Sequence, residues 1–316
     1  MRAVGPRRGW PCRPRRCETQ RLLVPSMPAQ AGMEPRHSAL SGVSAAAVAS
    51  TVGGAPLHGV HIDSVGTGPP LVLLHGWAMH SGLFAPLVPR LAEKFRVHRI
   101  DLPGHGYSAP VVPYVLATIT AAVADAVSRL RDAVAGPLTV LGWSLGGAVA
   151  MHWARAEPER VDRLILTGAT PCFVTQPDWP HAMAVATLRQ FGDELAVSYR
   201  LTLQRFVALQ VQGSEHARAV LGQLRTELFA RGEPSHVALR DALELLASTD
   251  LRADVAAIRQ PTVVISGGRD TLTPPEAGEW LARTLPHASF RLIPGAAHAP
   301  FLSHPESFLS AIADGA

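Results

Sequence analysis

Residues 138–147 read Leu138-Thr139-Val140-Leu141-Gly142-Trp143-Ser144-Leu145-Gly146-Gly147, the most informative segment of the chain for fold prediction. Four residues with strand character lead into Gly-x-Ser-x-Gly, and residues 148–154 continue at helical spacing. A strand, a sharp turn and a helix in this order form a nucleophile elbow, with a serine hydroxyl at its tip. Glycines fit beside that serine because so tight a turn leaves no room for neighbouring Cβ atoms. A plain Gly-rich loop is the alternative, but the flanking strand and helix favour the elbow, with Ser144 at the tip.

Strands and helices alternate on both sides of the elbow. Continuous apolar runs such as 71–74 are typical of strands that are buried on both faces of a parallel sheet. The predicted strands lie at 59–65, 71–74, 97–100, 138–141, 163–167, 261–266 and 289–293, and the predicted helices at 83–93, 116–134, 148–154, 275–284 and 303–312. The pattern predicts an α/β fold with a doubly wound, mostly parallel sheet and right-handed crossovers.

The alternation stops between residues 171 and 251. No convincing strand is present there, and apolar residues at helical spacing predict four helices, at 182–190, 193–212, 215–231 and 235–246. We therefore expect an all-helical insertion that forms a lid, carried by a core made of residues 56–170 and 252–316.

The basic charge of the chain is concentrated at its start. Residues 1–40 hold eight arginines against two glutamates, a net charge of +6, so the whole-chain charge of +4 leaves −2 for the remainder. Nucleic-acid binding by the folded part is therefore not expected. Residues 1–55, rich in Arg, Pro and Ala, are predicted to be a disordered extension, or an over-long translation start with Met27 or Met33 as the real one. A signal peptide is disfavoured because no apolar segment follows the arginines directly.

The overall composition is that of a globular protein. The chain has 316 residues, of which 47% are hydrophobic and 17% charged, enough to bury the core of one large domain. No run of about 18 apolar residues predicts a membrane span. Three cysteines, Cys12, Cys17 and Cys172, fit no dense disulfide framework, which favours a reducing cytoplasm.

Two residues downstream of the elbow complete a candidate catalytic triad. A serine hydroxyl is a poor nucleophile at neutral pH, so it needs a base within hydrogen-bond reach and a carboxylate that orients the base. Asp270 follows the 261–266 strand, and His298 follows the 289–293 strand. Singly, Asp270 could be a turn residue or helix cap and His298 a surface histidine. Their placement after strands, in the order Ser, Asp, His, favours a triad of Ser144, Asp270 and His298.

The tetrahedral intermediate of ester hydrolysis needs two hydrogen-bond donors for its oxyanion. We expect these to be the backbone N–H of Leu145, at a helix N-terminus, and that of Trp77, after the 71–74 strand. The Trp77 ring could instead be a core aromatic, and His75 is expected to brace the loop.

The sequence predicts no metal and no cofactor. The 14 histidines form no His-Glu-x-x-His pattern, and no Gly-rich phosphate or dinucleotide motif opens the first strand-helix unit. Asp101 and His105 could bind a metal, but a brace for their Gly-Pro loop is the preferred interpretation.

Several motifs resemble the α/β-hydrolase superfamily over residues 57–314 and, more narrowly, the pimeloyl-[acyl-carrier protein] methyl ester esterase family, the carboxylesterases of biotin synthesis. The more specific matches are the Trp143 elbow and the lid piece. The matching pieces are Leu74-His75-Gly76-Trp77, Asp101-Leu102-Pro103-Gly104-His105-Gly106, Gly142-Trp143-Ser144-Leu145-Gly146-Gly147, Pro171-Cys172-Phe173, Trp179-Pro180, Arg205-Phe206-Val207-Ala208-Leu209-Gln210, Ala297-His298-Ala299-Pro300-Phe301 and Ser303-His304-Pro305. The first 55 residues have no counterpart.

This resemblance implies a substrate and a partner. Ser144 would attack the methyl ester of a pimeloyl chain, His298 would pass the proton to methanol, and water would clear the acyl-enzyme. The lid residues Phe206, Val207, Ala208, Leu209 and Gln210 would line the acyl pocket, and lid arginines would receive an acidic acyl-carrier protein. The enzyme is expected to be a cytoplasmic monomer.

Charge within the lid agrees with such a partner. Residues 196–226 hold Arg200, Arg205, Arg218 and Arg225 against Glu215, a net charge of +3 in a folded body of −2. A basic surface could steer an acidic carrier, although a solvated helix face is the simpler alternative.

Rival functions remain open on the same residues. They are a generic short-chain carboxylesterase or a carbon–carbon bond hydrolase of the same fold and, from another class, a binding protein without turnover, although no triad member is missing.

Overall fold

The computed structural model describes residues 59–130 and 136–314. The chain divides into two units, Met1–Gly53 and Gly54–Ala316, and every described residue belongs to the second. The predicted extension of residues 1–55 and the last residues of the helix predicted at 116–134 lie outside the described ranges.

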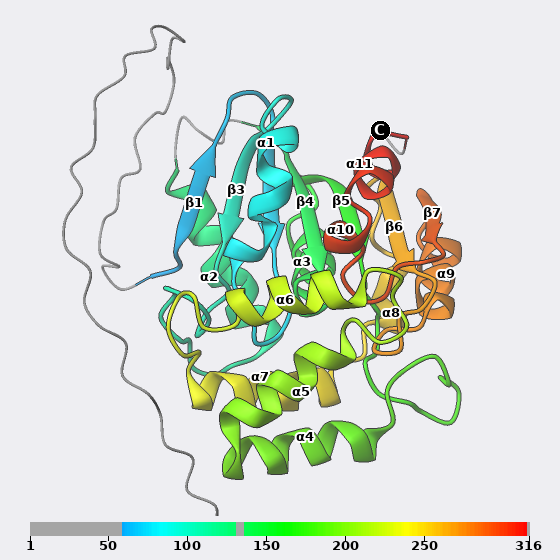
Figure 1. The fold of residues 1–316 in the computed structure, drawn as a ribbon. Coiled ribbons are helices and arrows are strands. Elements are labelled where there is room, and N and C mark those ends of the chain that lie inside the picture. Colours follow the sequence, from blue (N-terminus) through cyan, green and yellow to red (C-terminus); the bar gives the residue numbers. More distant parts are fainter. Residues whose placement is uncertain (1–58, 131–135, 315–316) are drawn as a thin grey trace, which may run out of the picture. The chain divides into compact units, whose positions relative to one another are not determined.

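A seven-stranded sheet forms the centre of the fold (Figure 1). Its strand order is β1-β3-β2-β4-β5-β6-β7, and only β1 runs antiparallel to its neighbour. The strands are β1 (Ile62–Val65), β2 (Pro70–Leu74), β3 (Arg96–Ile100), β4 (Leu138–Trp143), β5 (Val161–Thr167), β6 (Thr262–Gly267) and β7 (Ala288–Ile293). Every residue of β2 and β6 is buried, as the continuous apolar runs predicted. The α/β-hydrolase fold with a doubly wound, mostly parallel sheet is therefore confirmed.

Helices cover both faces of the sheet. Helix α3 packs on β4 and β5 and against α2, whereas α1 and α11 lie on the opposite face (Figure 1). The helices outside residues 171–251 are η1 (Ser81–Leu87, a 3₁₀ helix), α1 (Val88–Leu91), α2 (Leu116–Ser128), α3 (Leu145–Ala156), α8 (Arg252–Val255), α9 (Pro275–Thr284), α10 (Pro300–Ser303) and α11 (Pro305–Asp314).

Prolines divide two of the predicted helices. The helix predicted at 83–93 is the 3₁₀ helix η1, with Pro86 inside it, followed by the short α1. The helix predicted at 303–312 is divided into α10 and α11 just before Pro305. Proline lacks a backbone N–H and favours the first turn of a helix, so each new helix begins at or next to one.

Residues 171–251, the lid segment, contain four helices and isolated β-bridges. The helices are α4 (Val185–Val197), α5 (Tyr199–Leu209), α6 (Ala217–Glu227) and α7 (His236–Ser248). The helix predicted at 193–212 is wrong in its bounds: the chain turns at Ser198, whose φ of −137° and ψ of 55° are not helical. Figure 1 shows α4 to α7 gathered at the edge where the parallel strands end.

Candidate active site

Ser144 lies between β4 and α3 in a strained turn. It is one of two non-glycine residues with positive φ in the described chain, with φ 55° and ψ −119°. A Cβ on Gly146 would collide with the carbonyl oxygen of Leu74, so the start of α3 can approach β2 only without a side chain there. Such backbone strain costs about 1–3 kcal/mol and is concentrated at functional sites. The structure thus gives the elbow geometry that the Gly-x-Ser-x-Gly pattern predicts.

Asp270 and His298 meet at the same edge of the sheet. The Nδ1 of His298 lies 2.8 Å from Oδ2 of Asp270, across 28 residues of sequence. Both side chains are buried, with 4% of Asp270 and 2% of His298 exposed. An Nδ1–H that donates to the carboxylate leaves Nε2 unprotonated in the neutral ring, which is the form a general base requires.

The backbone of His298 is held from two sides. Trp143, the residue before Ser144, donates its Nε1–H to the His298 carbonyl oxygen at 2.8 Å. The His298 N–H donates to the carbonyl oxygen of Gln210, at the end of α5, at 3.1 Å. The elbow and the lid segment therefore both fix the histidine that would serve Ser144.

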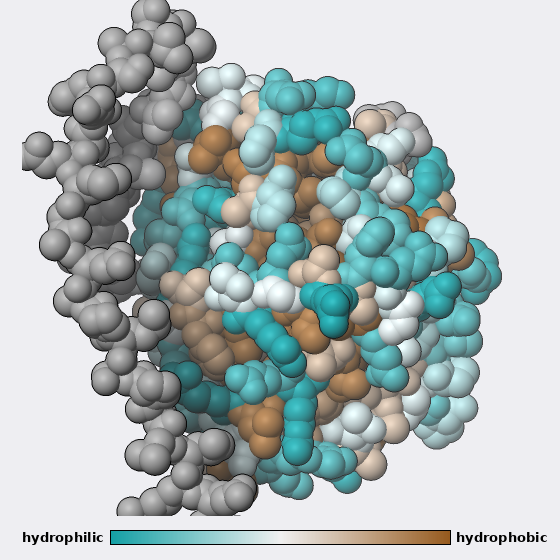
Figure 2. All heavy atoms as spheres, viewed as in Figure 1, coloured by the Kyte–Doolittle hydropathy of each residue, from teal (hydrophilic) through white to brown (hydrophobic). Residues whose placement is uncertain are grey.

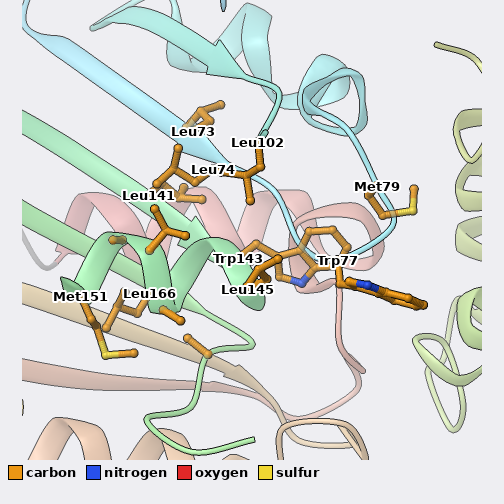
Figure 3. Packing of buried hydrophobic residues seen from close by; sticks show 14 of the residues in the cluster. Leu73, Leu74, Trp77, Met79, Leu102, Leu141, Trp143, Leu145, Met151 and Leu166 are labelled. Atoms are coloured by element: carbon orange, nitrogen blue, oxygen red, sulfur yellow. The ribbon is translucent and has the colours of Figure 1, made fainter. Parts of the chain in front are cut away.

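The two predicted oxyanion donors flank Ser144. Leu145 is the first residue of α3, where free backbone N–H groups and the helix dipole favour negative charge. A Cβ on Gly76 would lie 3.0 Å from the Ser144 Cβ, so the loop that carries Trp77 passes directly beside the nucleophile. Figure 3 shows Trp77, Trp143 and Leu145 near one another at the end of the sheet, with Leu73, Leu74 and Leu141 farther back along the strands.

His75 braces this loop. Its Nδ1 donates to the Gly76 carbonyl oxygen at 2.8 Å, and its Nε2 accepts from the Leu102 N–H at 2.8 Å. Burial lowers the pKa of His75 to about 3, so the ring stays neutral and keeps both roles at neutral pH.

A narrow, mostly apolar cavity opens above Ser144 and His298. Its walls come from the core loops and from lid helices α4, α5 and α7. The lining residues are Trp77, Ser144, Phe173, Met183, Leu188, Phe191, Phe206, Leu243, Leu246, Leu272, Thr273 and His298. Trp77, a residue of the core, also contacts the lid segment. Its Nε1–H donates to the Leu239 carbonyl oxygen of α7 at 2.9 Å, and its ring lies edge to face on Phe206 of α5.

Of the five lid residues predicted to line an acyl pocket, only Phe206 lines this cavity. Val207 is fully buried, Gln210 is 99% buried, and Ala208 and Leu209 are also outside the lining set. The wall residues of α4 and α7 are not among the site residues predicted from the sequence. Their spacing indicates a shared apolar face on each helix, because Leu188 and Phe191 of α4, and Leu243 and Leu246 of α7, are three residues apart.

The lid arginines differ in their partners. Arg200 forms an ion pair with Glu233, and Arg205 pairs with Glu194 at 3.0 Å. Both glutamates lie outside the 196–226 window in which the lid charge was counted. Arg218 and Arg225 on α6 form no ion pair within the described chain, and with Glu227 at the end of the same helix they leave α6 a net charge of +1 (+2 − 1).

Asp101 and His105 brace their own loop. Asp101 accepts hydrogen bonds from the backbone N–H groups of Ser81 (2.8 Å) and Tyr107 (2.9 Å), and Nδ1 of His105 bonds the Pro103 carbonyl oxygen at 3.1 Å. Within residues 59–130 and 136–314, no group of three or more His, Cys, Asp or Glu side chains could hold a metal ion.

Comparisons with known proteins agree with this geometry. A family model described as the alpha/beta hydrolase fold matches residues 69–305. The pimeloyl-[acyl-carrier protein] methyl ester esterase of Nitrosomonas europaea is 45% identical over 251 residues, which cover 79% of this chain and 97% of that protein. The esterase of the same name from Xanthomonas campestris pv. campestris is 46% identical over 258 residues, covering 80% and 97%.

A solved structure shares the fold at lower identity. Bromoperoxidase from Bacillus anthracis superposes with a TM-score of 0.74 at 24% identity, covering 81% of this chain and 94% of that chain. That likeness concerns the fold alone, whereas the two esterases match nearly their whole length. The chain therefore belongs to the alpha/beta hydrolase fold family and, within it, to the family of the pimeloyl-[acyl-carrier protein] methyl ester esterases.

Proposed function

We propose that this protein is a serine carboxylesterase that hydrolyses the methyl ester of pimeloyl-[acyl-carrier protein] to the free acid and methanol, in biotin synthesis. The relatives carry that activity in their names and match most of the chain. The observation that carries the proposal is the cavity, because an elbow serine and an Asp-bound histidine open into one apolar space under the lid segment.

The residues support a two-step mechanism. Ser144 Oγ attacks the ester carbonyl carbon as His298 Nε2 takes its proton, and Asp270 stabilises the imidazolium that forms. The N–H groups of Leu145 and Trp77 bind the oxyanion. When the intermediate collapses, His298 gives the proton to the leaving methoxide, and methanol departs. Water, deprotonated by His298, then attacks the acyl-enzyme and releases the carboxylic acid and Ser144.

The cavity walls suit a neutral methylene chain. No Asp, Glu, Lys or Arg side chain lines the cavity. Each methylene buried against such walls contributes about 0.8 kcal/mol, whereas an unpaired carboxylate there would be strongly disfavoured. The ester end is therefore favoured over the acid that replaces it, which helps the product to leave.

Positive charge on the lid segment supports docking of an acidic carrier. Arg218 and Arg225 lie on α6, and Arg200 and Arg205 lie on α5. Figure 2 shows hydrophilic side chains on the visible face of the molecule, with hydrophobic patches between them. Complementary charge chiefly raises the association rate, so the unpaired Arg218 and Arg225 should contribute most.

The proposal extends to the state of the protein in the cell. We place it in the cytoplasm as a monomer, and the free, buried thiol of Cys172 supports a reducing compartment. None of the described helices is both long and apolar enough to cross a bilayer.

Two measurements test the activity. The purified protein should convert pimeloyl-carrier methyl ester with a burst of methanol equal to the enzyme concentration, and its gene should restore growth without biotin in a strain that lacks this esterase. Turnover of acetyl esters with no action on the carrier-bound ester would leave a generic short-chain esterase. Stoichiometric binding with no labelling of Ser144 by a serine-reactive probe would leave a binding protein.

Carrier docking is tested by charge reversal. The double variant Arg205→Glu with Arg218→Glu should lower kcat/KM on the carrier-bound ester by about 10-fold or more at low salt, and less at high salt. The matched control reverses two exposed arginines, Arg129 at the C-terminal end of α2 and Arg283 on α9, which pair with Asp125 of α2 and Glu279 of α9. Equal losses on the carrier ester and a small neutral ester, or equal losses in the control, would exclude docking at this face.

A further inference from the structure

Thr273 contacts two members of the candidate triad. It lies in the loop between β6 and α9 and is 97% buried. Its Oγ1 donates to Oδ2 of Asp270 at 2.8 Å and lies 3.3 Å from Nδ1 of His298. Thr273 also lines the cavity.

The carboxylate of Asp270 accepts four hydrogen bonds. Oδ1 accepts the backbone N–H groups of Leu272 (2.9 Å) and Thr273 (3.0 Å). Oδ2 accepts the Thr273 hydroxyl and the His298 ring, each at 2.8 Å. Three of the four bonds survive any change of the Thr273 side chain, and only the hydroxyl bond depends on it.

We infer that the Thr273 hydroxyl is a positioning group for ester hydrolysis, acting through Asp270 on His298. This inference rests on the proposed hydrolase function of the triad. The hydroxyl fixes the direction in which Oδ2 faces the imidazole, and as a second donor it holds the carboxylate ionised while His298 carries the proton of Ser144.

Because the Thr273 hydroxyl has a single hydrogen, this arrangement favours one tautomer of His298. Because an ionised carboxylate can only accept, the hydroxyl must donate to Asp270, and it cannot also donate to Nδ1 of His298. The arrangement is fully bonded when Nδ1 itself carries a hydrogen and donates to Oδ2. The opposite tautomer would turn the Nδ1 lone pair toward the carboxylate, so the hydroxyl and the carboxylate together select the ring that keeps Nε2 free.

Two substitutions separate the hydroxyl from the shape of the side chain. Thr273→Val removes the hydroxyl and keeps the volume, whereas Thr273→Ser keeps the hydroxyl and removes a methyl group from the cavity wall. If Thr273 only fills space, Ser should be the more harmful change. If the hydroxyl positions Asp270, Val should be more harmful.

The test uses the full chain and a p-nitrophenyl ester, which any esterase triad can turn over. We expect Thr273→Val to lower kcat by about 10- to 100-fold, as for loss of a hydrogen bond to a charged group, with KM within about 2-fold. Thr273→Ser should retain at least about a third of wild-type kcat, with KM raised by about 4-fold or less. In Thr273→Val the acidic limb of the kcat/KM profile should move to higher pH, because a carboxylate with one donor fewer binds the imidazolium more strongly. The Ser variant should keep the wild-type profile.

Equal kcat values for Thr273→Val and wild type, or a Ser variant as impaired as the Val variant, would overturn the inference. If the Val variant melts far below wild type, Thr273→Ala can be compared with Thr273→Ser instead. A role for the hydroxyl then requires that kcat of the Ser variant be at least 5-fold higher than kcat of the Ala variant. A wild type that hydrolyses the p-nitrophenyl ester but not the carrier-bound ester would refute the proposed substrate and leave this inference standing. A wild type inactive on every ester would refute both.

Discussion

Helix α3 of the core buries nine of its twelve residues, whereas helix α6 of the lid segment buries two of its eleven. The core helix is enclosed by the sheet and by α2, so nearly every side chain on it is fixed by packing. Helices α4, α5 and α6 bury only two to four residues each, which is typical of amphipathic surface helices, whereas α7 buries six of its thirteen. Side chains that need an exact position, such as Ser144, are therefore found in the core. The lid segment contributes walls of the cavity and positively charged surface residues.

Arg231, which is largely buried, forms a strongly polar tie between the lid segment and the core. Its guanidinium donates to Oδ2 of Asp63 (2.6 Å) and Oδ2 of Asp101 (2.9 Å) and lies over the ring of Tyr107. Asp101 is fully buried and the Arg231 side chain is only 12% exposed. A buried carboxylate that loses its cation is costly, so this contact holds the lid segment against the core loops.

Loss of the nucleophile or the general base in the core should lower activity most. Ser144→Ala and His298→Ala should each lower kcat on the order of 10⁶-fold while the melting temperature stays within a few degrees of wild type. Steady-state turnover and thermal unfolding check this pair of expectations. Retention of a tenth of wild-type activity by either variant would refute the role of that residue.

Asp270→Asn should lower kcat by about 10⁴-fold. The amide would present a hydrogen to Nδ1 of His298 and favour the wrong tautomer, without a change of volume. Measurement of kcat for this variant and for wild type from pH 5 to 9 tests the expected loss. A loss below 100-fold would mean that another group orients the histidine.

Arg231→Met tests the tie between the two regions. Removal of the cation should lower the free energy of unfolding by about 3 kcal/mol, because Asp101 keeps a buried charge without its ion-pair partner. Denaturant unfolding measures the loss, and hydrogen exchange should rise in α6 and α7 before it rises in the sheet. The control, Arg240→Met, breaks an exposed pair with Asp241 and should cost less than about 1 kcal/mol. Uniform faster exchange throughout the sheet would show that Arg231 stabilises the whole domain equally.

This tie should also depend on pH. The hydrogen bond to His61 lowers the pKa of Asp63, and contacts with Arg231 lower it further, although burial opposes them. Because the folded pKa lies below the unfolded value near 3.9, folding stabilises the ionised carboxylate: the contribution is complete above that value and is lost as the pH falls below it. The stability gap between wild type and Arg231→Met should therefore be constant from pH 6 to 8 and narrow below about pH 4. A gap that widens in acid would contradict this assignment.

The smallest effect concerns the cavity wall on the lid side. Phe206→Ala should weaken transition-state binding of long acyl esters by roughly 1–3 kcal/mol, about 5- to 150-fold in kcat/KM, with little change for acetyl esters. Parallel kinetics on hexanoyl and acetyl esters decide it. An equal loss on both would make Phe206 a structural residue through its contact with Trp77.

The core could be predicted from sequence further than the lid segment. Ser144, Asp270 and His298 each follow a parallel strand of the sheet. Because the carboxyl ends of parallel strands meet at one edge, the order of the three residues predicts that they lie close together. The turn at Ser198 was missed because helical spacing continues across it and no proline or glycine marks it. The partners of Arg231 are 130 and 168 residues away in sequence, so no local pattern indicates them.

The glycines of the elbow set a limit on how this protein can change. Any side chain at Gly142 or Gly146 would meet backbone atoms, which cannot move aside as a flexible side chain can. Substitutions at Gly142 and Gly146 should therefore disrupt the fold whatever the substrate, whereas exposed positions of α4 to α6 should tolerate many residues. A laboratory search for new ester specificities should leave residues 142–147 untouched and diversify the lid helices, where new chemistry can arise without loss of the fold.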